Sequence, residues 1–364
     1  MSTLTDDLEN DVRSRPARVS TASFPETNVE QTPDGAFRRQ RNWFTTRFGE
    51  GDARVRPEAG RYLLLGNPGC GWNRRQLITL RLLGLTEAVP FVLLTGRDDK
   101  GWRIAPSGND LAQRFGSNLL NDFYRRTDPN FGGRGTSPTV IDSVTGTVVT
   151  NNYHLLSLDW ETAWAPFHMA GAPDLYPEAL RAEIDLLNQQ IFDDVNNGTY
   201  KVIFATNPEA ARAAKTVFEA RLADYDFRLS SRRYLFGEQL TASDIRLFVT
   251  LSSFERGYRP GIARIFGEEN TARVQDFPSL WAYARDLFSQ GFVDDRELYF
   301  LGLLPGPSGD YLEGSLVVGD APLPTPEESL AAWREPHGRD ALGGSPLYSG
   351  PGGGGSYELW HFAD

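Results

Sequence analysis

The chain has 364 residues, a formal net charge of −11 and a single cysteine. Its length allows two domains with a sizeable core, and its apolar and aromatic content is that of a globular protein. The acidic balance argues against nucleic acid and membrane partners, and no apolar run is long enough to span a membrane. The N-terminal residues lack the apolar core of a secretory signal, and one cysteine excludes an internal disulfide framework. We therefore expect a cytoplasmic protein.

The first part of the chain predicts a small α/β domain. Residues 1–34 are polar and rich in proline and threonine, which indicates a flexible N-terminal arm. Within residues 35–165, a strand–helix–strand order completed by a hairpin is typical of a thioredoxin-like thiol-binding domain. The elements expected there are a strand at 61–65, a helix at 70–83, a strand at 89–95 and a hairpin of 139–142 with 147–150.

The second part of the chain predicts helices, so that the fold class is α/β plus all-α. Residues 170–300 are expected to form a helical substrate-binding domain, with a capping box where Thr241 precedes Asp244. Residues 301–364 are rich in glycine and proline and predict a mostly irregular C-terminal extension. The main helices are expected at 178–196, at 208–230, from Thr241 onward and at 277–290.

The only cysteine, Cys70, is predicted in the first turn of the helix at 70–83. A lone cysteine is commonly an inert buried side chain. At a helix N-terminus, however, unpaired amides and the helix dipole stabilise a thiolate and lower the pKa of the thiol. Arg74 and Arg75 add positive charge nearby. We therefore interpret Cys70 as a catalytic nucleophile rather than as a core residue.

An ordered set of short motifs between residues 35 and 300 carries a resemblance to a known family. An α/β domain with a cysteine at its first helix, followed by a helical domain, is the plan of the glutathione transferases. Within them the chain resembles the glutathionyl-hydroquinone reductases, the Xi class. The segments that carry the resemblance are Glu58-Ala-Gly-Arg-Tyr62, Cys70-Gly-Trp72, Gly101-Trp-Arg103, Asp128-Pro-Asn-Phe131, Gly133-Arg134, Thr145-Gly-Thr-Val-Val149, Asn151-Asn152, Asn196-Asn-Gly-Thr-Tyr200-Lys, Phe204-Ala-Thr206, Tyr234-Leu-Phe-Gly237, Leu240-Thr-Ala-Ser-Asp-Ile-Arg-Leu-Phe248 and Phe277-Pro-Ser-Leu-Trp281.

The resemblance implies an enzyme that reduces glutathionylated hydroquinones. In that chemistry the cysteine thiolate attacks the sulfur of the conjugate, the hydroquinone leaves, and a second thiol resolves the mixed disulfide. The resemblance also implies a homodimer, a small aromatic substrate and a low-molecular-weight thiol as co-substrate. The four histidines are scattered and the cysteine has no partner at ligand spacing, so we expect no metal; no glycine-rich phosphate loop implies a nucleotide.

The motif around the cysteine departs from the family pattern. The family usually reads Cys-Pro-Trp-Ala-His-Arg, whereas this chain reads Cys70-Gly-Trp-Asn-Arg-Arg75. A proline after the cysteine would fix the helix start, and glycine loosens it, but the redox chemistry needs only Cys70. The family's Val-Pro is matched by Ser137-Pro138, for which we expect a cis peptide bond. The resemblance implies that the backbone of Ser137 pairs with the cysteinyl backbone of a bound thiol.

Tyr153 and His154 replace the Glu-Ser that follows Asn-Asn in the family. That pair holds the γ-glutamyl end of glutathione, and Tyr153 cannot supply the anion. Mycothiol, a cysteine–sugar thiol, has no γ-glutamyl group, and its sugar would suit tyrosine and histidine. The sequence leaves three interpretations open: weak glutathione binding, use of mycothiol or another thiol, or a segment that only begins a structural helix.

The remaining candidate residues follow from the resemblance. Trp72, Trp102 and Arg134 would lie beside the bound thiol, and Tyr200 and Tyr299 would lie over the quinol. A phenol there can donate a proton to the departing quinol oxygen. Tryptophan and tyrosine are otherwise commonly packing residues, and arginine is commonly a solvated charge.

Three functions are consistent with the sequence. The first is a thiol-dependent reductase of aromatic thioether conjugates with Cys70 as nucleophile. The second is a diverged glutathione or mycothiol S-transferase or lyase in a specialised biosynthetic pathway. The third is a non-catalytic binding protein on the transferase fold.

Overall fold

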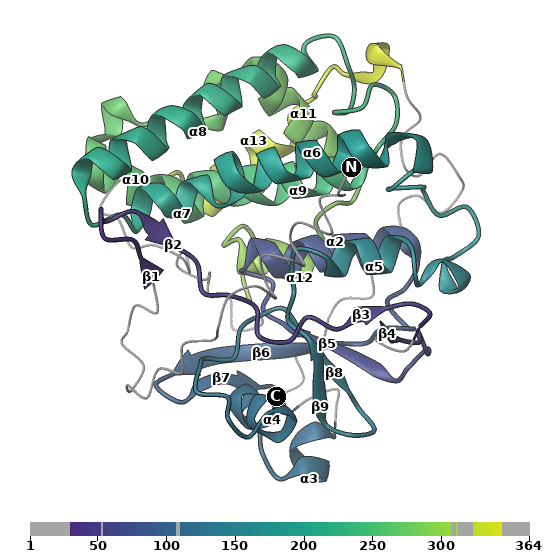
Figure 1. Ribbon diagram of the computed structural model, residues 1–364. Helices are drawn as coiled ribbons and strands as arrows, with labels where there is room; N and C mark the ends of the chain where they lie inside the picture. The colour runs from purple at the N-terminus through teal and green to yellow at the C-terminus, as the bar shows by residue number, and fades with distance from the viewer. Residues whose placement is uncertain (1–29, 52–53, 107–109, 307–310, 312–322, 344–364) are drawn as a thin grey trace. The chain divides into compact units, whose positions relative to one another are not determined.

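The structure is a computed structural model that describes residues 30–51, 54–106, 110–306, 311 and 323–343 (Figure 1). The chain divides into two compact units. The α/β unit comprises Gln40–Tyr176, and the helical unit comprises Glu30–Arg39 with the described residues from Pro177 onward. Most of the expected N-terminal arm and much of the C-terminal extension lie outside the described residues. No described helix combines the length and the apolar character that crossing a membrane requires.

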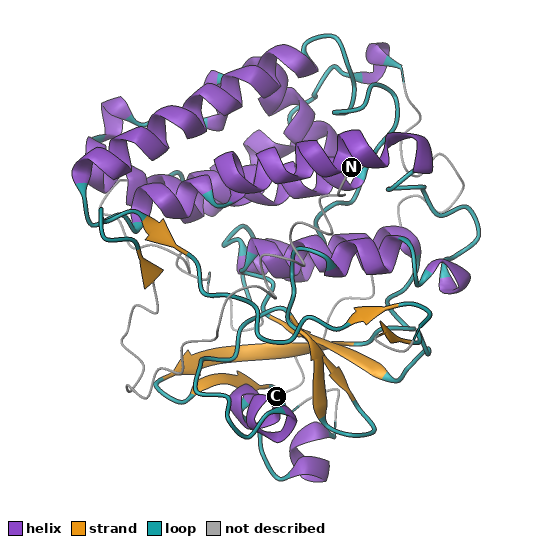
Figure 2. Cartoon of the chain, in the orientation of Figure 1, coloured by secondary structure: helices purple, strands orange, loops and turns teal. Residues whose placement is uncertain are grey.

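A five-stranded mixed sheet in the order β7-β6-β5-β8-β9 forms the centre of the α/β unit (Figure 2). β5 runs parallel to β6 and antiparallel to β8, with Leu65 opposite Thr139. This arrangement confirms the predicted thioredoxin-like fold. The strands are β5 (Tyr62–Gly66), β6 (Phe91–Asp98), β7 (Gly101–Ile104), β8 (Thr139–Asp142) and β9 (Thr147–Thr150), and a small parallel pair is formed by β3 (Arg47–Phe48) and β4 (Arg54–Val55).

Helices cover both faces of this sheet (Figure 1). Because side chains alternate along a strand, Leu63 and Leu65 lie on one face, in a core that includes Phe123 and Tyr124 of α4. On the other face α2 packs against α5. The helices of the unit are α2 (Gly71–Leu83), α3 (Leu111–Phe115), α4 (Leu120–Thr127), α5 (Leu156–Glu161) and the short 3₁₀ turn η1 (Ala165–Phe167).

Helix α2 begins and ends as the sequence indicates. Cys70 is its N-cap, with φ −94° and ψ 123°, and Gly84 follows its last turn with φ 72°. A side chain at Gly84 would also place its Cβ 2.5 Å from Cβ of Met169, so glycine is required there. In contrast to the surface position expected for basic residues, Arg74 and Arg75 are both 1% exposed.

The helical unit is built from helices that the sequence predicted and from several that it did not. The predicted helix at 178–196 is divided into a 3₁₀ turn, an α-helix and a π-helical segment. The elements are β1 (Glu30–Gln31), β2 (Phe37–Arg38), η2 (Glu178–Leu180), α6 (Arg181–Gln190), η3 (Ile191–Asn196), α7 (Gly198–Ile203), α8 (Pro208–Leu229), α9 (Ala242–Ser253), η4 (Phe254–Tyr258), α10 (Arg259–Phe266), η5 (Glu268–Asn270), η6 (Val274–Asp276), α11 (Pro278–Ser289), α12 (Asp295–Phe300), α13 (Pro326–Arg334) and η7 (Asp340–Leu342).

The capping box predicted at the start of α9 is confirmed. The backbone amide of Thr241 donates to the carboxylate of Asp244 at 2.8 Å, and the amide of Leu235 donates to the same carboxylate at 2.9 Å. The hydroxyl of Tyr283 donates to it as well, at 2.9 Å. Burial raises the pKa of Asp244, while these three hydrogen bonds oppose that shift. Asp244 therefore joins α9, α11 and the preceding loop.

The C-terminal extension contains a helix, α13, where mostly irregular structure was expected. Its Trp333 is 6% exposed and packs against Trp281 and Phe288 of α11, with ring centroids 4.6 and 5.2 Å away. Trp333 thus extends the core of the helical unit. Thr325 and Glu328 form its capping box, a signal that the sequence analysis overlooked.

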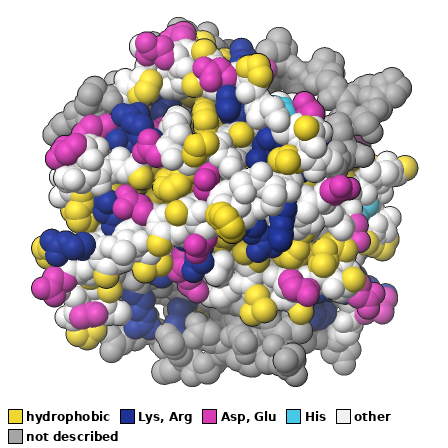
Figure 3. Space-filling view, turned by 90° about the horizontal axis from the view of Figure 1, so that it is seen from above, with side chains coloured by type: hydrophobic (Ala, Val, Ile, Leu, Met, Phe, Trp, Pro, Cys, Tyr) yellow, Lys and Arg dark blue, Asp and Glu magenta, His cyan; other side chains and the backbone are white. Residues whose placement is uncertain are grey.

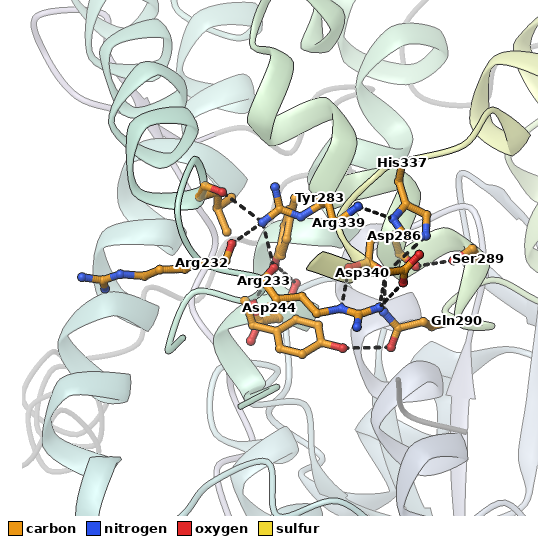
Figure 4. Close-up of polar contacts among 12 residues, drawn as sticks. Arg232, Arg233, Asp244, Tyr283, Asp286, Ser289, Gln290, His337, Arg339 and Asp340 are labelled. Atoms are coloured by element: carbon orange, nitrogen blue, oxygen red, sulfur yellow. Dashed lines mark hydrogen bonds and ion pairs between the residues drawn. The ribbon is translucent and has the colours of Figure 1, made fainter. Parts of the chain in front are cut away.

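Arg339, which follows α13, is buried among backbone carbonyls (Figure 4). Its guanidinium donates to the carbonyl oxygens of Leu229 and Arg233 at 3.0 Å each and of Ser279 at 3.2 Å, and also to that of Arg232. It therefore satisfies the last turn of α8 and the loop that follows.

A buried ion pair lies beside this arginine (Figure 4). Arg233 donates to both oxygens of Asp286 at 2.9 and 3.0 Å, and Gln290 donates to the same carboxylate at 2.7 Å. The hydrogen bond to Asp286 raises the pKa of Arg233, so the guanidinium stays charged.

On the face shown in Figure 3, charges of both signs are interspersed among the described residues rather than gathered into one basic area.

We predict that Arg339→Ala lowers the free energy of unfolding of the helical unit by about 3 kcal/mol, because buried carbonyl groups lose a charged donor. Urea unfolding followed by circular dichroism measures this. Arg334→Ala, which removes an exposed arginine from α13, is the matched control and should change stability little. Equal effects of the two substitutions would contradict the assigned role of Arg339.

Candidate functional site

Cys70 ends a tight turn that leads from β5 into α2. The side chain of Asn67 donates to the carbonyl of Leu94 at 2.9 Å and accepts from the amide of Gly69 at 2.9 Å. The amide of Cys70 donates to the carbonyl of Asn67 at 3.0 Å. These bonds fix the turn, so that Cys70 lies at the N-terminus of α2 while remaining partly exposed.

The peptide bond between Ser137 and Pro138 is cis, as predicted. It directly precedes β8, and the antiparallel pairing of β5 with β8 brings this loop to the edge of the sheet from which the Cys70 turn departs. A second contact joins the two segments. The side-chain Nδ2 of Asn73, in the first turn of α2, donates to Oγ of Ser137 at 2.8 Å, and this hydroxyl donates to Oδ1 of Asn73 at 3.0 Å.

The cis-proline loop is also held from the side of α4. The carboxamide of Asn121 accepts from the amide of Gly135 at 2.7 Å. The hydroxyl of Tyr124 lies 2.7 Å from Oγ1 of Thr139 and 3.2 Å from the carbonyl of Thr136. Burial raises the pKa of Tyr124, so its hydroxyl keeps its proton at neutral pH.

The backbone amide and carbonyl groups of Ser137 are not used in hydrogen bonds within the described structure. Among the described residues, none forms a hydrogen bond with its amide or its carbonyl group. Backbone groups that are not satisfied within the protein are available to a ligand or to water. The structure therefore presents one backbone donor and one backbone acceptor next to the segment that carries Cys70.

Three aromatic side chains at the start of α2 and before α5 form a cluster of tilted rings. The ring of Tyr153 lies 4.8 Å from that of Trp72 and 4.2 Å from that of His154. Trp72 and Tyr153 are each 7% exposed, whereas His154 is half-buried. Arg75 donates to the backbone carbonyl of Tyr153 and lies 5.7 Å from the Trp72 ring. Tyr153 is thus mainly a packing residue, and His154 is the more accessible of the two.

The segment that leads to Tyr153 and His154 is positioned by the side chains of Asn151 and Asn152. The side chain of Asn151 accepts from the amides of Trp43 and Phe44 at 3.1 and 2.8 Å. The side chain of Asn152 accepts from the amide of His154 at 3.2 Å. This motif ties the end of β9 to the segment before β3 and directs the chain into α5.

Trp102 and Arg134 occupy less distinctive surroundings. Trp102 is a partly buried residue of β7 that packs against the sheet core, and the guanidinium of Arg97 lies 5.9 Å from its ring. Arg134 is half-buried in the cis-proline loop, and its carbonyl accepts from Gln40 at 3.1 Å. Their expected role beside a bound thiol stays a prediction.

The two tyrosines predicted to contact the quinol belong to the helical unit. The ring of Tyr200, in α7, lies 6.0 Å from that of Phe37 and 5.6 Å from that of Tyr258. The guanidinium of Arg39 lies 4.2 Å from the centre of the Tyr200 ring and donates to Asn197 at 3.1 Å. Tyr299 lies on α12, against Phe300.

Tyr200 and Tyr258 each adjoin a π-helical segment. Tyr200 follows η3 (Ile191–Asn196), and Tyr258 ends η4 (Phe254–Tyr258). Single-turn π segments within helices are frequent at functional sites. The sequence analysis identified Tyr200 but missed Arg39 and Tyr258, whose contacts depend on residues far away in the chain.

Comparison of the chain with known proteins shows similarity to glutathione transferases. The profile of the glutathione S-transferase C-terminal domain matches residues 208–286. The glutathionyl-hydroquinone reductase YqjG of Escherichia coli is 32% identical over 327 residues, which cover 84% of this chain and 93% of that protein.

Two solved structures show the same likeness. The glutathione transferase Xi of Phanerochaete chrysosporium has a TM-score of 0.66 at 28% identity, covering 80% of this chain and 97% of that chain. The glutathione-bound structure of YqjG has a TM-score of 0.64 at 28% identity, covering 89% of this chain and 99% of that chain.

The fold and these matches define an enzyme of the glutathione transferase superfamily. Within it, the chain belongs to the family of the glutathionyl-hydroquinone reductases, the Xi class. The family expected from the sequence motifs is confirmed.

We predict that Gly66→Ala lowers the free energy of unfolding by about 2 kcal/mol, because overpacking is costly in a buried strand. Its Cβ would lie 2.5 Å from Oδ1 of Asn73. Asn73→Ala should relieve most of this loss, which a double-mutant cycle in urea measures. Gly96→Ala, also in a strand but facing open space, is the control. Strict additivity of the Gly66 and Asn73 substitutions would contradict the packing described.

Proposed function

We propose that the chain is a thiol-dependent reductase that removes the thiol from an aromatic, quinol-like thioether conjugate. The observation that carries the proposal is the position of Cys70 at the N-terminus of α2, joined through Asn73 to the cis-proline loop. Helix N-terminal amides favour a thiolate. The backbone amide and carbonyl of Ser137, which form no hydrogen bond among the described residues, offer a donor and an acceptor to the cysteinyl part of a thiol.

The proposed reaction proceeds in two displacements. The thiolate of Cys70 attacks the sulfur of the conjugate and forms a sulfur–sulfur bond, while the carbon–sulfur bond to the ring breaks. Its electron pair stays with the aromatic product, which takes up a proton. A second thiolate then attacks the sulfur of the bound thiol, releasing a low-molecular-weight disulfide and restoring the Cys70 thiolate. The sulfur of the conjugate and the sulfur of the second thiol each lose one electron, and the ring carbon gains both as its bond to sulfur is replaced by a bond to hydrogen.

Glutathione is the thiol that the relatives support. YqjG is named as a glutathionyl-hydroquinone reductase, and its solved structure contains glutathione. In this chain we propose that Trp72, Trp102, Arg134, Ser137, Pro138 and His154 surround the thiol. The ring of Tyr153 would pack against the ring of His154 and hold it in place.

Tyr200 is the proposed proton donor to the quinol, with Tyr299 as a second phenol. The guanidinium of Arg39, above the face of the Tyr200 ring, stabilises negative charge that develops on the phenol oxygen. A homodimeric, cytoplasmic enzyme without a metal or nucleotide completes the proposal.

We predict that the protein forms a mixed disulfide when exposed to glutathione disulfide or mycothiol disulfide, and that excess of the same thiol releases it. Intact mass spectrometry measures both steps. Because Cys70 is the only cysteine, any adduct reports on that residue. Cys70→Ser should form no adduct.

Other outcomes would favour the rival functions. Cys70 that reacts with iodoacetamide but with neither disulfide would exclude the reductase cycle and leave a transferase, a lyase or a binding protein. Turnover of a conjugate without disulfide release would favour the transferase or lyase.

A second candidate co-substrate is mycothiol or another thiol that lacks a γ-glutamyl group. The observation that favours it is the cluster of aromatic rings at Tyr153 and His154, where the family has Glu-Ser. No carboxylate replaces the family acid at these two positions. A sugar can pack on an aromatic ring and hydrogen-bond to histidine.

We predict that the double substitution Tyr153→Glu with His154→Ser shifts the preference toward glutathione by about tenfold, since a recovered ion pair is worth about 1.4 kcal/mol or more. The ratio of resolution rates with glutathione and mycothiol, by stopped-flow assay, measures the shift. Tyr153→Phe keeps the ring and should leave the ratio unchanged. A shift toward mycothiol would show that these positions do not select the thiol in this way.

A further inference from the structure

Two side chains that depart from the family pattern contact each other. Asn73 stands where the family usually has alanine, and Ser137 stands where it usually has valine. In the structure their polar atoms lie 2.8 and 3.0 Å apart. A methyl group and an isopropyl group at these positions could only pack, whereas this pair forms a directional polar contact.

The Asn73 carboxamide has no freedom to turn away. Its side chain is fully buried, and its Oδ1 lies against Gly66, where even a Cβ would approach to 2.5 Å. A buried amide that lost Ser137 would be left with an unsatisfied donor, which is costly. The contact is therefore maintained in the folded protein.

The pair joins the two segments that must stay in register for thiol exchange. Asn73 lies three residues after Cys70, and its backbone amide donates to the carbonyl of Cys70 at 3.0 Å. Ser137 supplies the backbone groups that we propose dock the thiol. A change in the distance between them would move the incoming sulfur away from the line of attack.

Gly71 makes the contact between Asn73 and Ser137 more important for the geometry of the first turn of α2. The family proline at this position would fix the first turn of the helix, and glycine leaves that turn less constrained. The hydrogen bond from Asn73 to Ser137 connects this first turn of α2 to the cis-proline loop.

We infer that Asn73 is a positioning residue: acting through Ser137, it holds the thiol-docking backbone in register with Cys70 and compensates for the absence of proline at position 71. The inference rests on the proposed function, because it assumes that Cys70 exchanges with a thiol docked at Ser137. The side chain of Asn73 itself takes no part in the chemistry.

The experiment compares two reactions of Cys70 in the same variants. Alkylation by iodoacetamide, measured over a pH series, reports the thiolate and needs no docking. Adduct formation with glutathione disulfide, with mycothiol disulfide in parallel, needs the docked thiol. Asn73→Ala and Ser137→Val should each slow disulfide exchange by about tenfold and leave alkylation within about twofold.

Two further variants separate positioning from stability. The double variant Asn73→Ala with Ser137→Val, which recreates the family's apolar pair, should recover most of the exchange rate. Adding Gly71→Pro to Asn73→Ala should recover it as well. Thr79→Ala removes a buried hydroxyl from the same helix, where it donates to the carbonyl of Arg75, and should lower the melting temperature without slowing exchange.

Three results would overturn the inference: unchanged exchange in both single variants, a parallel fall of alkylation and exchange, or a failure of both rescues. Failure of the proposed function is distinguishable. In that case unmodified protein forms no adduct with either disulfide, whereas failure of the inference alone leaves the unmodified protein reactive.

Discussion

The antiparallel pairing of β5 with β8 is the constraint on which the candidate site depends. It places Leu65 opposite Thr139, so the end of one strand and the start of the other lie at the same edge of the sheet. The turn to Cys70 leaves from the first strand, and the cis-proline loop leads into the second. A shift of register by one residue would turn every side chain of one strand to the opposite face and separate the two segments.

Polar side chains then refine what the strand pairing brings together. Asn121 and Tyr124 hold the cis-proline loop from α4, and Asn73 holds it from α2. Buried polar networks are favourable only when their members are satisfied, and such networks specify one arrangement among several of similar packing. Side-chain hydrogen bonds thus hold the cis-proline loop against both α2 and α4 within the α/β unit.

The sequence predicted the parts of the molecule that have local signals. The strand before Cys70, the helix after it and the capping box at Thr241 each have a recognisable period or spacing, and each is confirmed. Helix α13 was missed because its surroundings are rich in glycine and proline, although Thr325 and Glu328 carried a capping signal. Family motifs identified the residues around Cys70, and the cis bond before Pro138 followed from them.

The contacts that join distant residues could not be predicted in this way. Nothing in the local sequence indicates that Arg39 lies over Tyr200, or that Arg339 satisfies the end of α8. The local sequence also does not indicate that Arg74 and Arg75 are both buried, or that Arg75 donates to the backbone carbonyl of Tyr153.

The composition of the helical unit also determines the order in which the protein can fold during synthesis. Its first segment, Glu30–Arg39, leaves the ribosome early, yet Asn197, the partner of Arg39, follows 158 residues later, and Arg339 emerges later still. The described residues of the α/β unit, by contrast, all come from one stretch of the chain, Gln40–Tyr176, and domains generally fold as units from the N-terminal side. A nascent chain can therefore complete the unit that carries Cys70 before all the segments of its helical unit have been synthesised.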